Sequence, residues 1–333
     1  MRALILHGPG DLKLGHVEDP SPPPGWVRIR VKRAGICGTD KAFYKGTYRP
    51  GKLPLIPGHE VAGVVDEVGR GVDRDIIGRK VTTEINVYCG NCWFCRRGIP
   101  THCPYRQTIG ISIDGGMAEY LLTRRDLLHF ADDLDFGELA LIEPLAAAVE
   151  MIEMQNVEEG SRVVVLGAGA LGLLAVMVLS SLDLTDLVVV TRPGSPKAKL
   201  AKELGAHVVL SADEVFEYIS RNTPEGQGFD YVVESTGSPE GLDLAVKLVR
   251  PRGVIAAKST HGSPTTLDYT SLVVKEARIV GSRCGPFEKA LELARTRQLK
   301  LDRIITGIYP LDRGVEAFEA SFRRDSVKIQ LEV

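Results

Sequence analysis

The feature that most constrains this chain is a glycine-rich stretch at residues 162–175. A β-branched run from Arg162 to Leu166 is followed by the pattern Gly-x-Gly-x-x-Gly, and an apolar helical pattern begins directly after it. With a strand before it and a helix after it, this pattern is typical of a turn that binds a dinucleotide pyrophosphate. Free N–H groups at the helix N-terminus favour the phosphate charge. The residues expected to line the dinucleotide are Gly167, Ala168, Gly169, Ala170, Leu171 and Gly172.

The same region has a second interpretation, because residues 163–182 contain no charged side chain. A run of this length can cross a bilayer. Three glycines within six residues argue against that interpretation, and the run divides naturally into a buried parallel strand and a buried helix. We therefore predict no membrane association here.

Length and composition set further bounds. A chain of 333 residues is long enough for two domains, and its formal net charge of −2 argues against a nucleic-acid partner. The N-terminal apolar run is too short for a signal peptide, so a cytoplasmic location is expected. Six cysteines in such a chain suggest metal or redox chemistry before disulfides.

The chain changes character near residue 146. The first part is β-rich, with period-two alternation at residues 27–32 and another strand-like run at 61–68, and an alternating strand returns at 327–331. After residue 146, short apolar runs alternate with helical patterns, as in a doubly wound parallel sheet. The predicted strands are 162–166, 187–191, 207–210, 231–235, 254–257 and 277–280, and predicted helices include 196–204 and 242–249.

Four cysteines form the sharpest local motif: Cys89-x2-Cys92-x2-Cys95-x7-Cys103. Four thiolates can close a tetrahedron around zinc and leave no open position, which makes a structural site. An iron–sulfur cluster is the main alternative, because Pro104 follows the last cysteine as it does in ferredoxin motifs. The last gap is seven residues here instead of three, so zinc is favoured over iron–sulfur, disulfides or bare thiols.

Two further segments carry candidate metal ligands. Cys37 lies in Gly-Ile-Cys-Gly-Thr-Asp, and His59 and Glu60 follow about twenty residues later in Pro-Gly-His-Glu. Taken alone, such a cysteine or histidine is more often structural than functional. Together they supply a thiolate, an imidazole and a carboxylate, which are ligands that zinc prefers.

These motifs, in this order, resemble the zinc-containing medium-chain dehydrogenases, and the resemblance covers essentially the whole chain. It implies a mixed α/β fold: a GroES-like, β-rich catalytic domain at residues 1–145 and 286–333, and a Rossmann domain at 146–285. The active site of this family lies in the cleft between the two domains. A homo-oligomer, either a tetramer or a dimer, is the family expectation.

The resemblance also assigns roles to individual residues. Cys37 and His59 match the catalytic zinc ligands, and either Glu60 or Glu143, in Ile-Glu-Pro-Leu-Ala, completes the set. The Glu-Pro-Leu form is similar to the polyol and sugar dehydrogenase branch, although Glu143 could instead cap a helix that starts at Pro144. Thr39 matches the hydroxyl that handles the substrate proton, on what we expect to be an extended segment. Many relatives continue the proton relay with a histidine where this chain has Ala42.

The end of the second predicted strand selects the cofactor. An NAD site would carry an acid there, for the ribose 2′-OH. Asp186 lies nineteen residues after Gly167, but it precedes the strand and is expected at the opposite edge of the sheet. The strand's carboxyl end carries Arg192 and no acid, and Ser195 is a good N-cap for a following helix. We therefore predict NADP(H), held by Thr191, Arg192, Ser195 and Lys197.

The sequence thus predicts a zinc-dependent, NADP-preferring alcohol dehydrogenase or carbonyl reductase that acts on a small molecule. Glu143 favours polyols or sugars, by resemblance. Four apolar residues expected to face the cleft favour bulky hydrophobic alcohols or ketones, and the two indications conflict. A zinc-independent NADPH quinone reductase of the same fold and a non-enzymatic NADPH- or zinc-binding module stay open as alternatives. The four apolar residues are Ile85, Val87, Ile109 and Ile111.

Overall fold

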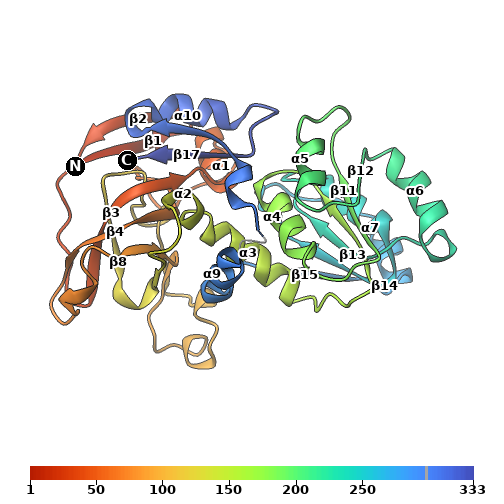
Figure 1. Cartoon of the computed structure of the whole chain (residues 1–333), viewed down its shortest axis with the longest axis horizontal. Helices are drawn as coiled ribbons and strands as arrows, with labels where there is room; N and C mark the ends of the chain where they lie inside the picture. Colours follow the sequence, from red (N-terminus) through yellow and green to blue (C-terminus); the bar gives the residue numbers. More distant parts are fainter. Residues whose placement is uncertain (297–298) are drawn as a thin grey trace. The chain divides into compact units, whose positions relative to one another are not determined.

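The computed structural model describes residues 1–296 and 299–333. It divides the chain into two compact units, each with its own sheet (Figure 1). The first unit contains Met1–Glu143 and Ile305–Val333, and the second contains Pro144–Ile304. The mixed α/β fold class predicted from the sequence is confirmed.

The first unit is built around a mostly antiparallel sheet. Seven strands of the described residues form it, in the order β16-β17-β3-β4-β5-β9, with β8 pairing with β3 beside this path. The long strand β3 pairs with β8 along its first half and with β17 along its last three residues. The two hairpins β1-β2 and β6-β7 are separate antiparallel pairs. The strands of this unit are β1 Arg2–Gly8, β2 Asp11–His16, β3 Trp26–Gly35, β4 Glu60–Val68, β5 Lys80–Thr83, β6 Asn86–Val87, β7 Gln107–Thr108, β8 Tyr120–Arg124, β9 Leu128–Phe130, β16 Ile305–Pro310 and β17 Lys328–Glu332.

Short helices join these strands. The α-helix α1 follows β3 directly, and α10 packs against β16 and β17. Apolar side chains from both sequence segments of the unit share one core, which includes Val31 of β3, Phe43 of α1, Phe318 of α10 and Leu331 of β17. The helices are α1 Gly38–Lys45, α2 Phe136–Leu139 and α10 Gly314–Ser321, with 3-10 turns η1 Arg74–Ile76, η2 Cys95–Arg97, η3 Pro100–His102, η4 Arg125–Leu127 and η7 Leu311–Arg313.

The second unit is a parallel sheet with helical crossovers. Within the described residues its six strands lie in the order β12-β11-β10-β13-β14-β15, and every neighbouring pair is parallel. The order runs outward in both directions from β10, which is the doubly wound arrangement of a Rossmann fold. All six predicted strands are confirmed, with shifts of at most two residues at their ends, except that β14 begins at Val249 and not at Val254. The strands are β10 Arg162–Leu166, β11 Asp186–Val190, β12 Val208–Leu210, β13 Phe229–Glu234, β14 Val249–Ala257 and β15 Arg278–Gly281.

Helices follow most of these strands. The run at residues 163–182 that is free of charge becomes the buried strand β10 and the buried helix α4. Across the part of the chain that the structure describes, no helix combines the length and apolar character needed to cross a membrane. The helices of this unit are α3 Ile142–Glu153, whose first two residues belong to the first unit, α4 Ala170–Leu179, α5 Lys197–Glu203, α6 Glu214–Asn222, α7 Gly241–Leu248, α8 Tyr269–Val274 and α9 Phe287–Arg295, with η5 Pro224–Gly226 and η6 Leu301–Ile304.

One predicted domain boundary differs from the structure. The sequence predicted that the chain returns to the first domain at residue 286, whereas residues up to Ile304 belong to the second unit. The helix α9 accounts for the difference, because Phe287 and Leu291 are buried and Lys289 forms an ion pair with Glu153 of α3. A Cβ atom at Gly285 would lie 1.7 Å from the carbonyl oxygen of Ala146 in the same unit, so the two segments touch at backbone distance.

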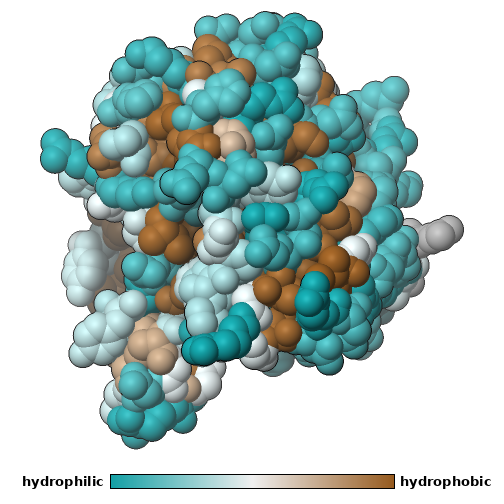
Figure 2. Space-filling view, turned by 90° about the vertical axis from the view of Figure 1, so that its left-hand side faces the viewer, coloured by the Kyte–Doolittle hydropathy of each residue, from teal (hydrophilic) through white to brown (hydrophobic). Residues whose placement is uncertain are grey.

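One face of the first unit is mostly polar. Hydrophilic side chains dominate the face in Figure 2, which looks onto the side of β3, β4 and β8, and hydrophobic residues interrupt it in smaller groups. This is the ordinary partition of a folded domain with a buried core.

Candidate active site

The glycine turn between β10 and α4 is fixed by two close backbone approaches. Gly167 has a φ of 101°, and a Cβ atom there would lie 2.9 Å from the carbonyl oxygen of Ser235. At Gly172 a Cβ atom would lie 2.0 Å from the carbonyl oxygen of Gly167. These two glycines are therefore required by the protein's own packing.

Gly169 is different, because no contact of the described residues demands a glycine there. It is the N-cap of α4, with φ −79° and ψ 179°, which any residue can adopt, and no side chain caps the helix. Apart from its own helix and chain neighbours, no heavy atom of the described residues lies within 4 Å of the Cβ position. The open space before uncapped N–H groups suits a phosphate group.

The carboxyl end of β11 lies next to this turn. Arg162 and Asp186 lie opposite each other at the amino ends of β10 and β11, and the Tyr218 hydroxyl donates a hydrogen bond to Asp186. Asp186 is thus at the opposite edge from the glycine turn, as the sequence predicted.

Residues 191–197 follow β11 and contain no acid. Arg192 is exposed, and the Ser195 hydroxyl accepts the N–H of Lys197 over 3.3 Å. The helix α5 begins at Lys197, and the first residue after the strand, Thr191, is tied by its N–H to the carbonyl of Leu210. The segment therefore offers a guanidinium and hydroxyl groups.

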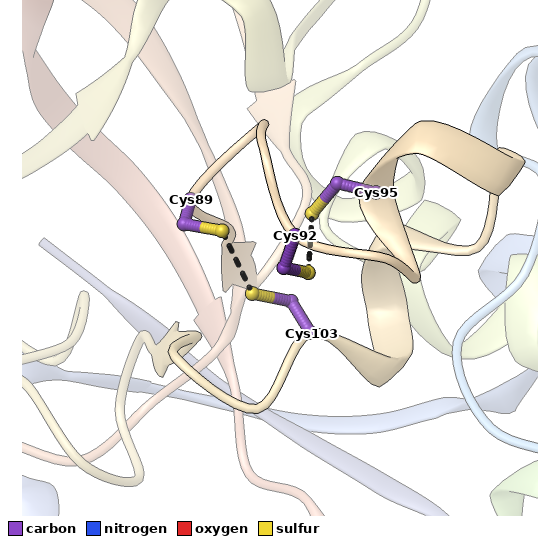
Figure 3. A group of neighbouring side chains, drawn as sticks. All are labelled: Cys89, Cys92, Cys95 and Cys103. Carbon is purple, nitrogen blue, oxygen red and sulfur yellow. Dashed lines mark hydrogen bonds between the residues drawn. The ribbon is translucent and has the colours of Figure 1, made fainter.

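The four cysteines of the lobe between β6 and β7 come together. Their sulfur atoms all lie within 4.8 Å of one another and point toward one another in Figure 3. Cys92 and Cys95 are 3.4 Å apart at sulfur, and Cys89 and Cys103 are 3.5 Å apart. A tetrahedron with Zn–S bonds of about 2.3 Å has edges of about 3.8 Å, so a small expansion admits the ion.

The thiols of this cluster differ in acidity. A hydrogen bond from the backbone of Asn91 lowers the pKa of Cys89 to about 7. A hydrogen bond from the backbone of Cys95 likewise lowers the pKa of Cys92, whereas burial and the Cys92 sulfur raise the pKa of Cys95 to about 11. Part of the cluster is therefore in the thiolate form, which binds metals, near neutral pH.

Cys37 stands at the start of α1. It is the N-cap of this helix, and its N–H donates to Asp40 over 2.8 Å. The expectation that Thr39 lies on an extended segment is wrong, because Gly38 already begins the helix and Asp40 caps it. Asp40 is buried and also accepts the N–H of Gly58 over 3.3 Å, so it ties the Cys37 segment to the segment before His59.

His59 lies against both of these groups. Its side chain is buried and contacts the Cys37 thiol, and its Nδ1 atom is 3.8 Å from Asp40. Burial lowers the pKa of His59, but the negative charges of Cys37, Asp40 and Glu143 outweigh it and raise this pKa well above its ordinary value of 6.5. Within the described residues, the buried Nδ1 atom has no hydrogen-bond partner. A positive charge is thus favoured at the His59 imidazole.

The two candidate carboxylates have different surroundings. Glu143 is the second residue of α3, is 7% exposed, and lies close enough to His59 to act on its pKa. Glu60 is 1% exposed, and both of its oxygens accept hydrogen bonds of 2.6 Å from Nζ of Lys328.

The predicted catalytic ligands are thus neighbours without forming a closed set. In residues 1–296 and 299–333, the four cysteines of the lobe are the set whose ligand atoms all lie within 4.8 Å. Cys37, His59, Glu60 and Glu143 do not meet that condition together. Cys37 and His59 are in contact, and Glu143 acts on His59 at longer range.

Comparisons with known proteins identify the family of this chain. Residues 23–133 match the alcohol dehydrogenase GroES-like domain, and residues 140–333 match the glucose dehydrogenase C-terminus. The chain is 31% identical over 341 residues to a sorbitol dehydrogenase of Halalkalibacterium halodurans, with 99% of each chain covered. An L-threonine 3-dehydrogenase of Pyrococcus horikoshii is also 31% identical, over 96% of this chain and 94% of the relative. The chain belongs to the zinc-containing medium-chain dehydrogenase/reductase family.

Solved structures of this family superpose on nearly the whole chain. A zinc-binding dehydrogenase from Sinorhizobium meliloti, bound to NADP, has a TM-score of 0.90 at 28% identity and covers 100% of this chain and 99% of its own. An alcohol dehydrogenase from Escherichia coli CFT073, complexed with NADH, has a TM-score of 0.90 at 27% identity with the same coverage. Members of this fold family therefore take either cofactor.

Two residues of this medium-chain dehydrogenase were missed by the sequence analysis. Asp40 follows Thr39 directly, and its position three residues after an N-cap could have indicated its capping role. Lys328 lies in a strand that alternates polar and apolar residues, which predicts a solvent-facing lysine. Instead Lys328 and Gln330 are both buried.

One prediction about substrate preference loses its support. Ile85, Val87 and Ile109 were expected to face the cleft, but each is at most 7% exposed, and Val87 and Ile109 belong to the core of the first unit. Ile111 is partly buried and packs against the same core. The preference for bulky hydrophobic substrates therefore no longer follows from these residues.

Proposed function

We propose that this chain is a zinc-dependent oxidoreductase that transfers a hydride between NADP(H) and an alcohol group of a polyol or sugar alcohol. The observation that carries the proposal is the contact between the half-buried Cys37 and the buried His59, with Glu143 nearby and net negative surroundings. A zinc-independent quinone reductase has no use for this set, and buried charges without a partner are costly.

The proposed catalytic metal ligands are Cys37, His59 and Glu143. The donor set suits zinc, because it combines a thiolate, an imidazole and a carboxylate. Glu60 is the less suitable third ligand, since Lys328 engages both of its oxygens. Zinc bound there would supply Lewis-acid polarisation of the substrate's carbon–oxygen bond.

The chain's own residues provide orientation and proton transfer. Asp40 accepts the N–H groups of Cys37 and Gly58, so it fixes the backbone that precedes α1 and His59. It also faces Nδ1 of His59, as carboxylates behind zinc-binding histidines do. Thr39 is half-buried at the second position of α1, and we assign its hydroxyl to accept or donate the substrate proton. With alanine at position 42, the proton leaves this hydroxyl through water or another group.

The second proposed metal is structural. Cys89, Cys92, Cys95 and Cys103 offer four sulfur ligands and no open position, which suits a zinc ion that clamps the lobe. The lobe contains only short strands and 3-10 turns, so it has little core of its own to hold it together.

The proposed cofactor site is the glycine turn together with the end of β11. Gly167 to Gly172 would hold the pyrophosphate, and Arg192, with Thr191, Ser195 and Lys197, would hold the adenosine 2′-phosphate. Support comes from the open space at Gly169 and from the absence of an acid at residues 191–197. The nicotinamide supplies the hydride chemistry.

The substrate class rests on the relatives and on Glu143. Polyol and phosphorylated polyol dehydrogenases recur among them, including a D-arabitol-phosphate dehydrogenase of Enterococcus avium at 30% identity. An L-threonine-type secondary alcohol is the other chemistry among the relatives. A cytoplasmic location and a homotetramer or homodimer stay predictions, and light scattering of the purified chain tests the latter.

The decisive experiment combines turnover with cofactor binding. Cys37→Ala should abolish hydride transfer to or from polyols while NADPH binding persists, and retained turnover would exclude the metal mechanism. Arg192→Ala should raise the Kd for NADPH about tenfold to a hundredfold, which is the range for a lost charged hydrogen bond, and it should raise the Kd for NADH by less than about threefold. Arg221→Ala is the matched control, because Arg221 is an exposed arginine of α6 that pairs with Glu217. If Arg192→Ala raises the Kd values for NADPH and NADH by the same factor, the 2′-phosphate assignment is refuted.

A further inference from the structure

Lys328 is a buried cation that contacts the two segments carrying the proposed ligands Cys37 and His59. It is 3% exposed, and its Nζ atom donates to both oxygens of Glu60 at 2.6 Å and to the carbonyl oxygen of Ile36 at 3.3 Å. Ile36 precedes Cys37 and Glu60 follows His59. The ammonium group of Lys328 thus links the backbone next to Cys37 with the side chain next to His59.

The sheet explains how these residues meet. β3 lies between β17 and β4, and Gly35 of β3 is directly opposite both Glu60 of β4 and Gln330 of β17. A Cβ atom at Gly35 would lie 2.0 Å from Oε2 of Glu60. The carboxylate therefore passes over a position without a side chain to reach Lys328 two strands away.

The ion pair between Lys328 and Glu60 determines the charge beside the proposed metal ligands. Both oxygens of the buried Glu60 carboxylate accept from this one ammonium group, so among the described residues Lys328 is its ion-pair partner. Without it, this buried carboxylate, next in sequence to His59, would be left to pair with a metal ion at Cys37, His59 and Glu143.

We propose that Lys328 is a positioning residue that holds Glu60 away from the metal, and so keeps three protein ligands and an open coordination position for substrate. This inference rests on the proposed catalytic metal site. Three ligands and one open position are what separates a catalytic zinc site from a structural one. If Lys328 is removed, Glu60 becomes the fourth ligand and closes the site.

Cobalt substitution provides a readout that is independent of activity. In wild-type protein loaded with Co²⁺, imidazole should enter the open position and shift the visible absorption bands. Lys328→Met should raise the imidazole concentration needed for this shift by at least about tenfold, which corresponds to about 1.4 kcal/mol. Lys328→Arg should retain the wild-type response, because it keeps the cation. Lys328→Met/Glu60→Gln should restore the response, because the amide no longer competes for the metal.

Gly35→Ala acts on the same carboxylate from another strand. Its Cβ atom would displace the end of the Glu60 side chain, so it should reproduce the Lys328→Met spectrum while Lys328 is intact. Melting curves of every variant report whether it folds. This second route decides the question if Lys328→Met does not fold.

The outcomes separate the two proposals. An imidazole response in folded Lys328→Met or Gly35→Ala that equals wild type overturns the role of Lys328 alone. A loss that Glu60→Gln does not reverse also overturns it, because the loss would then be structural. If Cys37→Ala binds as much cobalt as wild type and neither protein responds to imidazole, the catalytic metal site itself fails, and this inference fails with it.

Discussion

Two glycines of the same turn should respond oppositely to alanine, because one is required by packing and the other is not. At Gly172 the new Cβ atom would lie 2.0 Å from the carbonyl oxygen of Gly167, well inside the 3.0 Å that real Cβ atoms respect. The obstacle is backbone, so either α4 or the turn must move. Such overpacking costs about 1–3 kcal/mol. For a unit of this size, that lowers Tm by roughly 2–12 °C.

Gly169→Ala should leave the fold nearly unchanged. The backbone there has φ −79°, and the Cβ position is open among the described residues. Alanine reduces the entropy of the unfolded chain but is a poorer N-cap than glycine, and the two effects largely cancel, within about 1 kcal/mol. The methyl group would instead occupy the space assigned to the pyrophosphate. A steric penalty of about 1–3 kcal/mol then raises the Kd for NADPH about fivefold to a hundredfold.

The assay is a pair of measurements on each variant. Thermal melting without cofactor reports the fold, and calorimetric titration with NADPH reports the site. A tenfold weaker Kd also removes about 1.4 kcal/mol of the stabilisation that excess cofactor gives. The reasoning is refuted if Gly169→Ala binds NADPH as wild type does, or if it lowers Tm as much as Gly172→Ala.

Two further predictions concern the metals. Cys103→Ser should lower the zinc content by about one equivalent per chain and lower Tm, because structural zinc contributes folding free energy; unchanged zinc by atomic absorption contradicts the four-sulfur site. In zinc-depleted protein, burial lowers the pKa of His59, but Cys37, Asp40 and Glu143 outweigh it and raise this pKa well above 6.5. Protonation of His59 therefore stabilises the fold, and this contribution is complete below about pH 6.5. It is lost as the pH rises through the raised pKa of the folded protein. The same proton competes with zinc, so affinity measured against a chelator should rise by about tenfold per pH unit in this window, and a pH-independent affinity would contradict the assignment.

The second unit was predictable because its signals are local. The strands β10 and β11 are short apolar runs buried on both faces, and the glycine turn marks where β10 ends. The position of α9 was not predictable in this way. Its burial depends on the contact between Gly285 and Ala146 and on the ion pair between Lys289 and Glu153, which join segments more than a hundred residues apart.

The helix at Cys37 shows a different limit. Two residues separate Cys37 from Asp40, and Asp40 can bond to the N–H of Cys37 only if the backbone turns there into a helix. An extended segment is equally compatible with the glycines on either side of the cysteine. The choice is made by the buried position of Asp40, which also binds Gly58 from another part of the chain.

The third ligand could not be chosen from the sequence for a related reason. Glu60 is next to His59 in the chain, and adjacency favours it over Glu143, which is more than eighty residues away. However, the carboxylate of Glu60 crosses Gly35 to form an ion pair with Lys328, near the end of the chain, while His59 contacts Cys37. Lys328 thereby draws the neighbour in sequence away from the site, and Glu143, at the start of a distant helix, is left as the proposed third ligand.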